Sequence, residues 1–186
     1  MKIAYASDLH LEFGPLELKN TENADVLVLA GDIVVSEGLL PQHEWFFENC
    51  AKEFKDVVYV MGNHEHYNGD IQITEAQLHK VIGRWPNIHF LEKETITIDG
   101  VNFFGATLWT DMNKRDPYIL QYVNARMNDF VIVDNGPGVK WNTLEAARDH
   151  ERAIEALEAD LNIHGGKFVI VSHHAPSKQS IHPRYH

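Results

Sequence analysis

The sequence lacks the features that would place the chain in a membrane or outside the cell. It has one cysteine, Cys50, in 186 residues, which excludes an internal disulfide framework and a zinc site of four thiolates. Its apolar runs, such as residues 26–30, are too short to cross a bilayer, and the first residues leave no room for the apolar stretch of a signal peptide. We therefore expect a cytoplasmic protein with no membrane partner.

Positive charge is also scarce, since 16 Lys and Arg stand against 27 Asp and Glu, a formal net charge of −11. Proteins that bind phosphate backbones usually present a basic face, so this balance disfavours nucleic acid as a partner. No G-x-x-x-x-G-K-[ST] motif occurs, which excludes a P-loop nucleotide site. Carboxylates instead suit hard cations, and the 12 histidines add a second type of metal ligand.

The length, with 44% apolar and 23% charged residues, fits one globular domain over residues 1–186. Short continuous apolar runs are typical of strands buried on both faces. Such runs occupy residues 2–7, 26–30, 57–61 and 168–172. Alternation on either side of Asp99-Gly100 predicts an antiparallel hairpin over residues 94–106, because this dipeptide suits a two-residue type I′ turn.

Segments with apolar residues at helical spacing lie between most of these runs, so the predicted fold class is α/β. The spacing predicts helices near residues 41–54, 74–82 and 143–161, the last with Thr143 as its N-cap. Residues 112–142 are the least regular, and we expect an insertion or lid there, with a short helix near residues 118–127. Residues 177–186 are predicted to form a flexible tail.

A polar cluster follows each predicted parallel strand. The clusters are Asp8-Leu9-His10, Gly31-Asp32, Gly62-Asn63-His64-Glu65 and His173-His174. Loops at the carboxyl ends of strands form the binding crevice of open α/β sheets, so these side chains are expected to converge. Asp, Asn and His together are the ligands of manganese-, iron- and zinc-type cations. In an extended segment, Asp8 and His10 would point to the same side, and each glycine would allow close backbone approach.

The order D-L-H, G-D, G-N-H-E, S-H-H-A-P resembles the calcineurin-like metallophosphoesterase superfamily, and the likeness runs over residues 1–176. The resemblance implies a two-sheet α/β/β/α sandwich with two divalent metal ions (Mn, Fe or Zn) at the strand ends. It implies that Asp8 and His10 bind the first metal, Asp32 bridges both, Asn63 and His173 bind the second, and His64 is the catalytic acid. His174 is the neighbour that could exchange roles with His173.

One motif of the resembled family is missing. Its members carry Gly-His-x-His after the histidines of the last strand, with one ligand for each metal, and no G-H-x-H occurs here. We therefore expect a fold incomplete at its C-terminal end. Either the polypeptide is a truncated form or another chain supplies the missing part. Truncation also predicts self-association through an exposed sheet edge.

The resulting functional hypothesis is a metal-dependent phosphoric ester hydrolase, a phosphatase or phosphodiesterase acting on a small soluble ester. A two-metal centre with metal-bound hydroxide would attack phosphorus. Two alternatives remain open: a truncated, weakly metal-binding, non-catalytic remnant that serves interaction or regulation, and a metal-dependent hydrolase of carbon–nitrogen or carboxylic ester bonds.

Overall fold

The fold contains two β-sheets, and the computed structural model describes residues 1–37, 40–182 and 184. The first sheet is four-stranded and parallel, in the order β1 (Ile3–Ala6), β2 (Val26–Ala30), β3 (Asp56–Val60) and β4 (Ile88–Phe90). The second is three-stranded: β5 (Glu94–Ile98) pairs antiparallel with β6 (Val101–Ala106), which pairs parallel with β7 (Lys167–Ser172). The strands expected from apolar runs are present to within a residue at each end.

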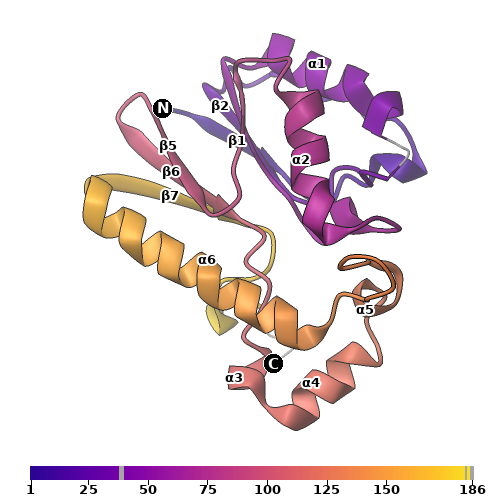
Figure 1. Ribbon diagram of the computed structural model, residues 1–186. Helices are drawn as coiled ribbons and strands as arrows, with labels where there is room; N and C mark the ends of the chain where they lie inside the picture. Colours follow the sequence, from indigo (N-terminus) through magenta and orange to yellow (C-terminus); the bar gives the residue numbers. More distant parts are fainter. Residues whose placement is uncertain (38–39, 183, 185–186) are drawn as a thin grey trace.

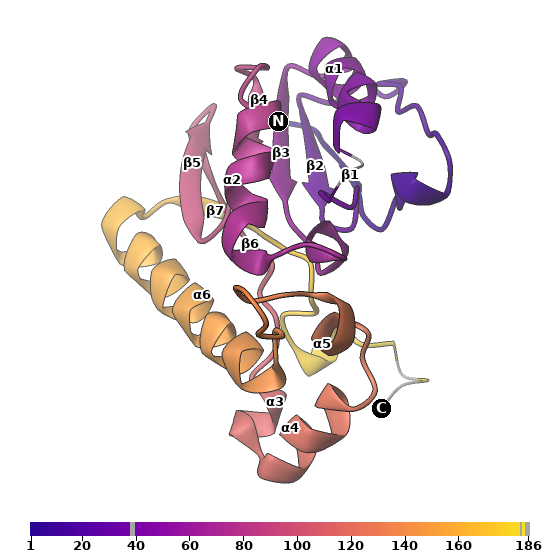
Figure 2. The same ribbon diagram turned by 45° about the vertical axis from the view of Figure 1, so that its right-hand side comes forward.

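Helices cover the outer face of each sheet, so the layers are helix, sheet, sheet and helix (Figure 1). Helices α1 (Glu44–Glu53) and α2 (Ile71–Ile82) lie on the first sheet, and α6 (Thr143–His164) runs along the second. Figure 2 shows the two sheets face to face with α2 in front of the first. The predicted α/β/β/α sandwich is confirmed.

Strand β2 contributes side chains to two hydrophobic cores, one on each face of the first sheet. Leu27 and Leu29 pack with α1 and α2, whereas Val26 and Val28 pack against the second sheet. Successive side chains of a strand point to opposite faces, so a continuous apolar run places apolar groups in both cores. A third core joins the second sheet to α6, where Phe104 contacts Ala153 and their neighbours.

The prediction that all four runs are buried on both faces is wrong for β1 and β7. Tyr5 of β1 is 84% exposed and Ile170 of β7 is 49% exposed. Each strand stands at the end of its sheet, with a paired strand on one side only among the described residues. An edge strand has fewer neighbours to cover its faces, so apolar character alone does not establish burial.

Two local predictions concern a hairpin turn and the N-cap of a helix: the first is confirmed and the second is wrong. Asp99 and Gly100 have φ of 46° and 79°, the two positive values that a type I′ hairpin turn requires. The N-cap of α6 is Asn142 and not Thr143, because the Asn142 side chain accepts hydrogen bonds from the N–H groups of Leu144 and Glu145. Thr143 is the first helical residue.

The segment expected to be irregular carries short helices and a core of its own. It contains α3 (Met112–Arg115), the expected short helix α4 (Pro117–Asn124), and α5 (Asp129–Ile132), all beyond one end of the two sheets (Figures 1 and 2). Its buried Phe130 and Trp141 pack together with Trp109, which precedes the segment, and with the first turns of α6. That the segment acts as a lid stays a prediction.

The described residues also form four 3₁₀ turns: η1 (Leu11–Phe13), η2 (Leu40–His43), η3 (His64–His66) and η4 (Lys178–Ser180). The turn η4 lies in the expected tail, and residues 183 and 185–186 of that tail lie outside the described residues. Over the described ranges, no helix combines the length and the apolarity needed to span a bilayer.

Candidate metal centre

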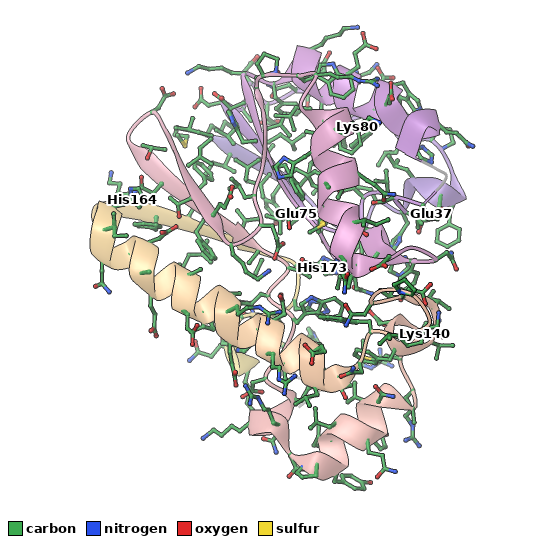
Figure 3. All side chains as sticks on the ribbon, viewed as in Figure 1. Glu37, Glu75, Lys80, Lys140, His164 and His173 are labelled. Carbon is green, nitrogen blue, oxygen red and sulfur yellow. The ribbon has the colours of Figure 1, made fainter. Side chains whose placement is uncertain are left out.

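The loops after β1 and β2 are tied together by their backbones. The N–H of Asp8 donates to the Gly31 carbonyl at 3.0 Å, and the N–H of His10 donates to the Asp32 carbonyl at 3.0 Å. The loop after β3 joins them because the N–H of His64 donates to Asp32 Oδ1 at 2.9 Å. In Figure 3, His173 at the end of β7 lies where both sheets meet the insertion. The structure thus brings the expected strand-end clusters to one place.

Asp32 is the centre of this site, and its two oxygens face different partners. Oδ1 lies 3.4 Å from Nε2 of His173, whereas Oδ2 lies 3.8 Å from Nε2 of His10 and 4.0 Å from Nε2 of His64. Asp32 is buried, and within the described part of the chain its ion-pair partners are imidazoles and not lysine or arginine. A carboxylate in this position can bridge two cations.

Two groups of potential metal ligands share Asp32, and in each group the ligand atoms lie within 4.8 Å of one another. One group contains His10, Asp32 and His64, and the other contains Asp8, Asp32 and His173. The family resemblance implies that Asp8 and His10 bind the same metal, and this assignment stays a prediction. The expected extended segment is wrong, because Asp8 and His10 have φ of 55° and 47°, in the left-handed region.

Left-handed backbone recurs at Asp32, whose φ is 55°. Aspartate and histidine adopt this region more readily than most residues do, although it still costs free energy. Such strain is characteristic of sites where the surrounding structure holds a side chain in a fixed direction. Here the backbone strain aims ligand-type side chains at one point.

Two glycines allow the loops to approach this closely, as their place in the motifs predicts. A Cβ at Gly31, where φ is 86°, would lie 2.5 Å from Nδ1 of His173. A Cβ at Gly62 would overlap Oδ1 of Asp32. Any side chain at either position would displace a site residue, so both glycines are required by close approach.

The group around His173 consists of hydrogen-bond acceptors that face one another. Nδ1 of His173 donates to the Ala30 carbonyl at 2.9 Å, which leaves the lone pair of a neutral ring on Nε2. That Nε2 lies 3.1 Å from Oδ1 of Asn63 and 3.4 Å from Oδ1 of Asp32. Acceptors packed this closely are stabilised by a positive charge between them, and this mixed oxygen and nitrogen set fits manganese, iron or zinc.

His174 points away from this group. Its Nδ1 donates to the Thr107 carbonyl at 3.2 Å, and its ring stacks on Trp109 with the centroids 5.2 Å apart. Burial lowers the pKa of His174, which favours the neutral form of its ring. Of the two histidines that the sequence left as alternatives, His173 is the one whose nitrogen faces Asp32.

Tyr67 connects the site to the insertion, and no pattern in the sequence singles it out. Its ring stacks on His64 with the centroids 3.9 Å apart, and its hydroxyl accepts from Nδ2 of Asn63 at 3.3 Å. The same hydroxyl donates to Oδ2 of the buried Asp129, on α5, at 3.4 Å. Burial and the charge of Asp129 raise the pKa of Tyr67 to about 12, so the hydroxyl keeps the proton that it donates.

Glu65 is a second residue that the sequence left without a role, although it belongs to the G-N-H-E motif. It is fully buried, and Oε2 accepts from the N–H groups of Asp32 at 3.0 Å and Gly62 at 2.7 Å. Oε1 accepts from the N–H of Ile33 at 2.8 Å and the hydroxyl of Tyr59 at 2.7 Å. Burial and the charge of Asp32 raise the pKa of Glu65. The carboxylate clamps the Asp32 loop to the Asn63 loop.

The comparisons with known proteins agree with this geometry. The family model of calcineurin-like phosphoesterases matches residues 1–185, and the chain therefore belongs to that family. It is 26% identical over 194 residues to Uncharacterized protein L509 of Acanthamoeba polyphaga mimivirus, an alignment that covers 94% of this chain and 68% of that protein.

Among solved structures, the fold is similar to that of phosphopantetheinyl hydrolase (PptH) from Mycobacterium tuberculosis. The TM-score is 0.66 at 17% sequence identity, and the match covers 96% of this chain and 70% of that one. At this identity the likeness establishes the fold alone. Membership of the phosphoesterase family assigns the chain to the metal-dependent hydrolases of phosphoric esters.

Proposed function

We propose that this chain hydrolyses a small phosphomonoester or phosphodiester at a two-metal centre. Asp8, His10, Asp32, Asn63 and His173 would hold the cations, with Asp32 between them. The observation that carries the proposal is the set of facing acceptors at Asp32, Asn63 and His173, 3.1 and 3.4 Å apart, since such a set is stable only around a positive charge.

The two divalent cations would activate a water molecule as nucleophile and neutralise charge on the phosphoryl oxygens. The residues of the chain supply the rest. Asp32 holds both halves of the site together, and Asn63 contributes a neutral oxygen whose direction Tyr67 fixes. Nε2 of His64 faces the same space, where the ring, when protonated on both nitrogens, would give its Nε2 proton to the departing alkoxide.

The substrate we propose is small because the net charge of −11 opposes binding of a nucleic acid backbone. The insertion of residues 112–142 reaches the site through Asp129, which makes it the candidate determinant of specificity. Because PptH is named a phosphopantetheinyl hydrolase, a phosphopantetheinyl ester belongs in the panel of test substrates.

The test is hydrolysis of p-nitrophenyl phosphate and bis(p-nitrophenyl) phosphate by the full chain with added Mn²⁺. We expect turnover to fall by roughly 10²- to 10⁴-fold in His64→Ala, as for the loss of a general acid, and at least as far in Asp32→Asn. The Asn side chain keeps the hydrogen bond from the His64 N–H but loses the charge. The matched control is His164→Ala, at the exposed far end of α6 in Figure 3, and it should leave turnover unchanged.

The alternatives give different results in the same assay. A non-catalytic remnant would show no Mn²⁺-dependent turnover above that of Asp32→Asn. A hydrolase of carbon–nitrogen or carboxylic ester bonds would leave both phosphate esters intact, cleave an amide or carboxylic ester, and resist inhibition by inorganic phosphate. Either result would overturn the proposal.

A further inference from the structure

Glu12 in η1 is shared by two imidazoles of the site. Its Oε1 lies 3.1 Å from Nδ1 of His10 and 3.3 Å from Nδ1 of His64. The two rings are themselves in edge-to-face contact, with their centroids 4.4 Å apart. The Glu12 side chain is largely buried, with 12% of its surface exposed. One carboxylate oxygen therefore holds two rings from different loops, one of them, His64, 52 residues along the chain from Glu12.

This contact fixes where each ring carries its proton. A carboxylate oxygen accepts hydrogen bonds and cannot donate them, so Nδ1 of both His10 and His64 must bear hydrogen. In a neutral imidazole the lone pair is then on Nε2. Both Nε2 atoms face Oδ2 of Asp32, at 3.8 and 4.0 Å, which is the side from which a cation would be held.

We infer that Glu12 is a positioning residue that sets the Nδ1–H tautomer of His10 and His64 together; this inference rests on the proposed function. Glu12 does for these two rings what the Ala30 carbonyl does for His173. Partners of this kind orient ligand rings and raise their basicity, and their loss typically lowers metal affinity 10- to 100-fold.

The hydrogen bonds of Glu12 distinguish a role in positioning the two rings from a role in stabilising the fold. Oε2 of Glu12 is buried without a hydrogen-bond partner among the described residues, whereas both oxygens of Glu65 accept two hydrogen bonds each. Glu12 therefore makes fewer hydrogen bonds than Glu65, and those of its Oε1 go to the two rings of the site.

The first experiment measures the tautomers directly in the full-length, metal-free chain. Long-range ¹H–¹⁵N correlation spectra at a pH above the imidazole range distinguish a protonated ring nitrogen from one with a lone pair. We expect Nδ1–H in both rings, with signals assigned by their loss in His10→Asn and His64→Asn. An Nε2–H tautomer at either ring would overturn the inference without any Glu12 variant.

The second experiment compares Glu12→Leu, which removes the acceptor, with Glu12→Gln, which retains an oxygen. We expect mixed tautomers at both rings and a 10- to 100-fold weaker calorimetric Kd for Mn²⁺ in Glu12→Leu. Glu12→Gln should keep the Nδ1–H tautomers. The matched control Glu17→Leu, an exposed glutamate of the same loop, should match the parent chain in both readouts.

The inference is overturned if Glu12→Leu folds and keeps both Nδ1–H tautomers and the parent Kd, or if Glu12→Gln loses these tautomers while remaining folded. The spectra do not depend on turnover. Absence of phosphoesterase activity would therefore contradict the proposed function but leave the tautomer result to stand or fall by itself.

Discussion

At the scale of single residues, the site shows how a buried carboxylate can be compatible with a stable fold. Glu65 is fully buried, and each of its oxygens accepts two hydrogen bonds. One of the donors is the N–H of Asp32, 33 residues away along the chain. Three of the four donors are backbone N–H groups, which cannot act as acceptors. An amide at this position would therefore always point its own N–H groups at another donor.

This arrangement predicts a clear cost for Glu65→Gln. The free energy of unfolding should fall by about 1–3 kcal/mol, because the amide leaves a buried backbone N–H such as that of Ile33 unsatisfied. Tyr59→Phe is the matched comparison, since it removes one hydroxyl donor and leaves the three N–H bonds in place. Urea unfolding with an unchanged m value measures both. A Glu65→Gln chain as stable as Tyr59→Phe would contradict the proposed clamp.

At the scale of elements, the sequence predicted what depends on local patterns. The run of β2 ends where the strand ends, and Asp99-Gly100 forms the expected turn, because apolar pattern and turn chemistry act over a few residues. The exposure of β1 was missed because it depends on which strands stand at the edge of a sheet. Thr143 was mistaken for the N-cap because Asn142 beside it is an equally good cap by residue type.

The same limit applies within the site. The ligand-type residues could be predicted because they follow strands whose ends meet. The roles of Glu12 and Tyr67 could not, because their partners come from other loops, 52 residues away for His64 with Glu12 and 62 for Asp129 with Tyr67. The one local signal was the pattern D-L-H-L-E, in which Glu12 follows His10 by two residues.

The contact between Tyr67, which follows η3, and Asp129 of α5 yields a prediction about the insertion. Tyr67→Phe keeps the ring on His64 but removes the hydroxyl that links Asn63 to Asp129. We expect hydrogen exchange of the α5 amides to quicken about fivefold, corresponding to roughly 1 kcal/mol for the lost hydrogen bonds. Tyr122→Phe on the exposed side of α4 is the control. Unchanged exchange in α5, or equal changes in both variants, would show that Tyr67 does not anchor the insertion.

At the scale of the whole molecule, the two incompletely covered strands lie beside the same hollow. Ile3 of β1 and Phe168 and Val169 of β7 line it together. On the same two strands, Tyr5 is 84% and Ile170 is 49% exposed. A strand at a sheet edge also offers unpaired backbone N–H and carbonyl groups, so apolar and hydrogen-bonding surfaces coincide here.

We propose that a second copy of the chain covers this surface. Light scattering behind size exclusion should show a mass that rises with protein concentration, and the double variant Tyr5→Lys, Ile170→Lys should weaken association by at least about tenfold, or roughly 1.4 kcal/mol. The reason is that association would bury two lysines without partners, and desolvation of an unpaired charge costs free energy. Ile163→Lys adds one such charge at a position 73% exposed on α6, and it should associate like the parent chain. A chain that stays monomeric at every concentration would contradict the proposal. Equal weakening by Ile163→Lys would also contradict it, since net charge and not the β1 and β7 edges would then control association.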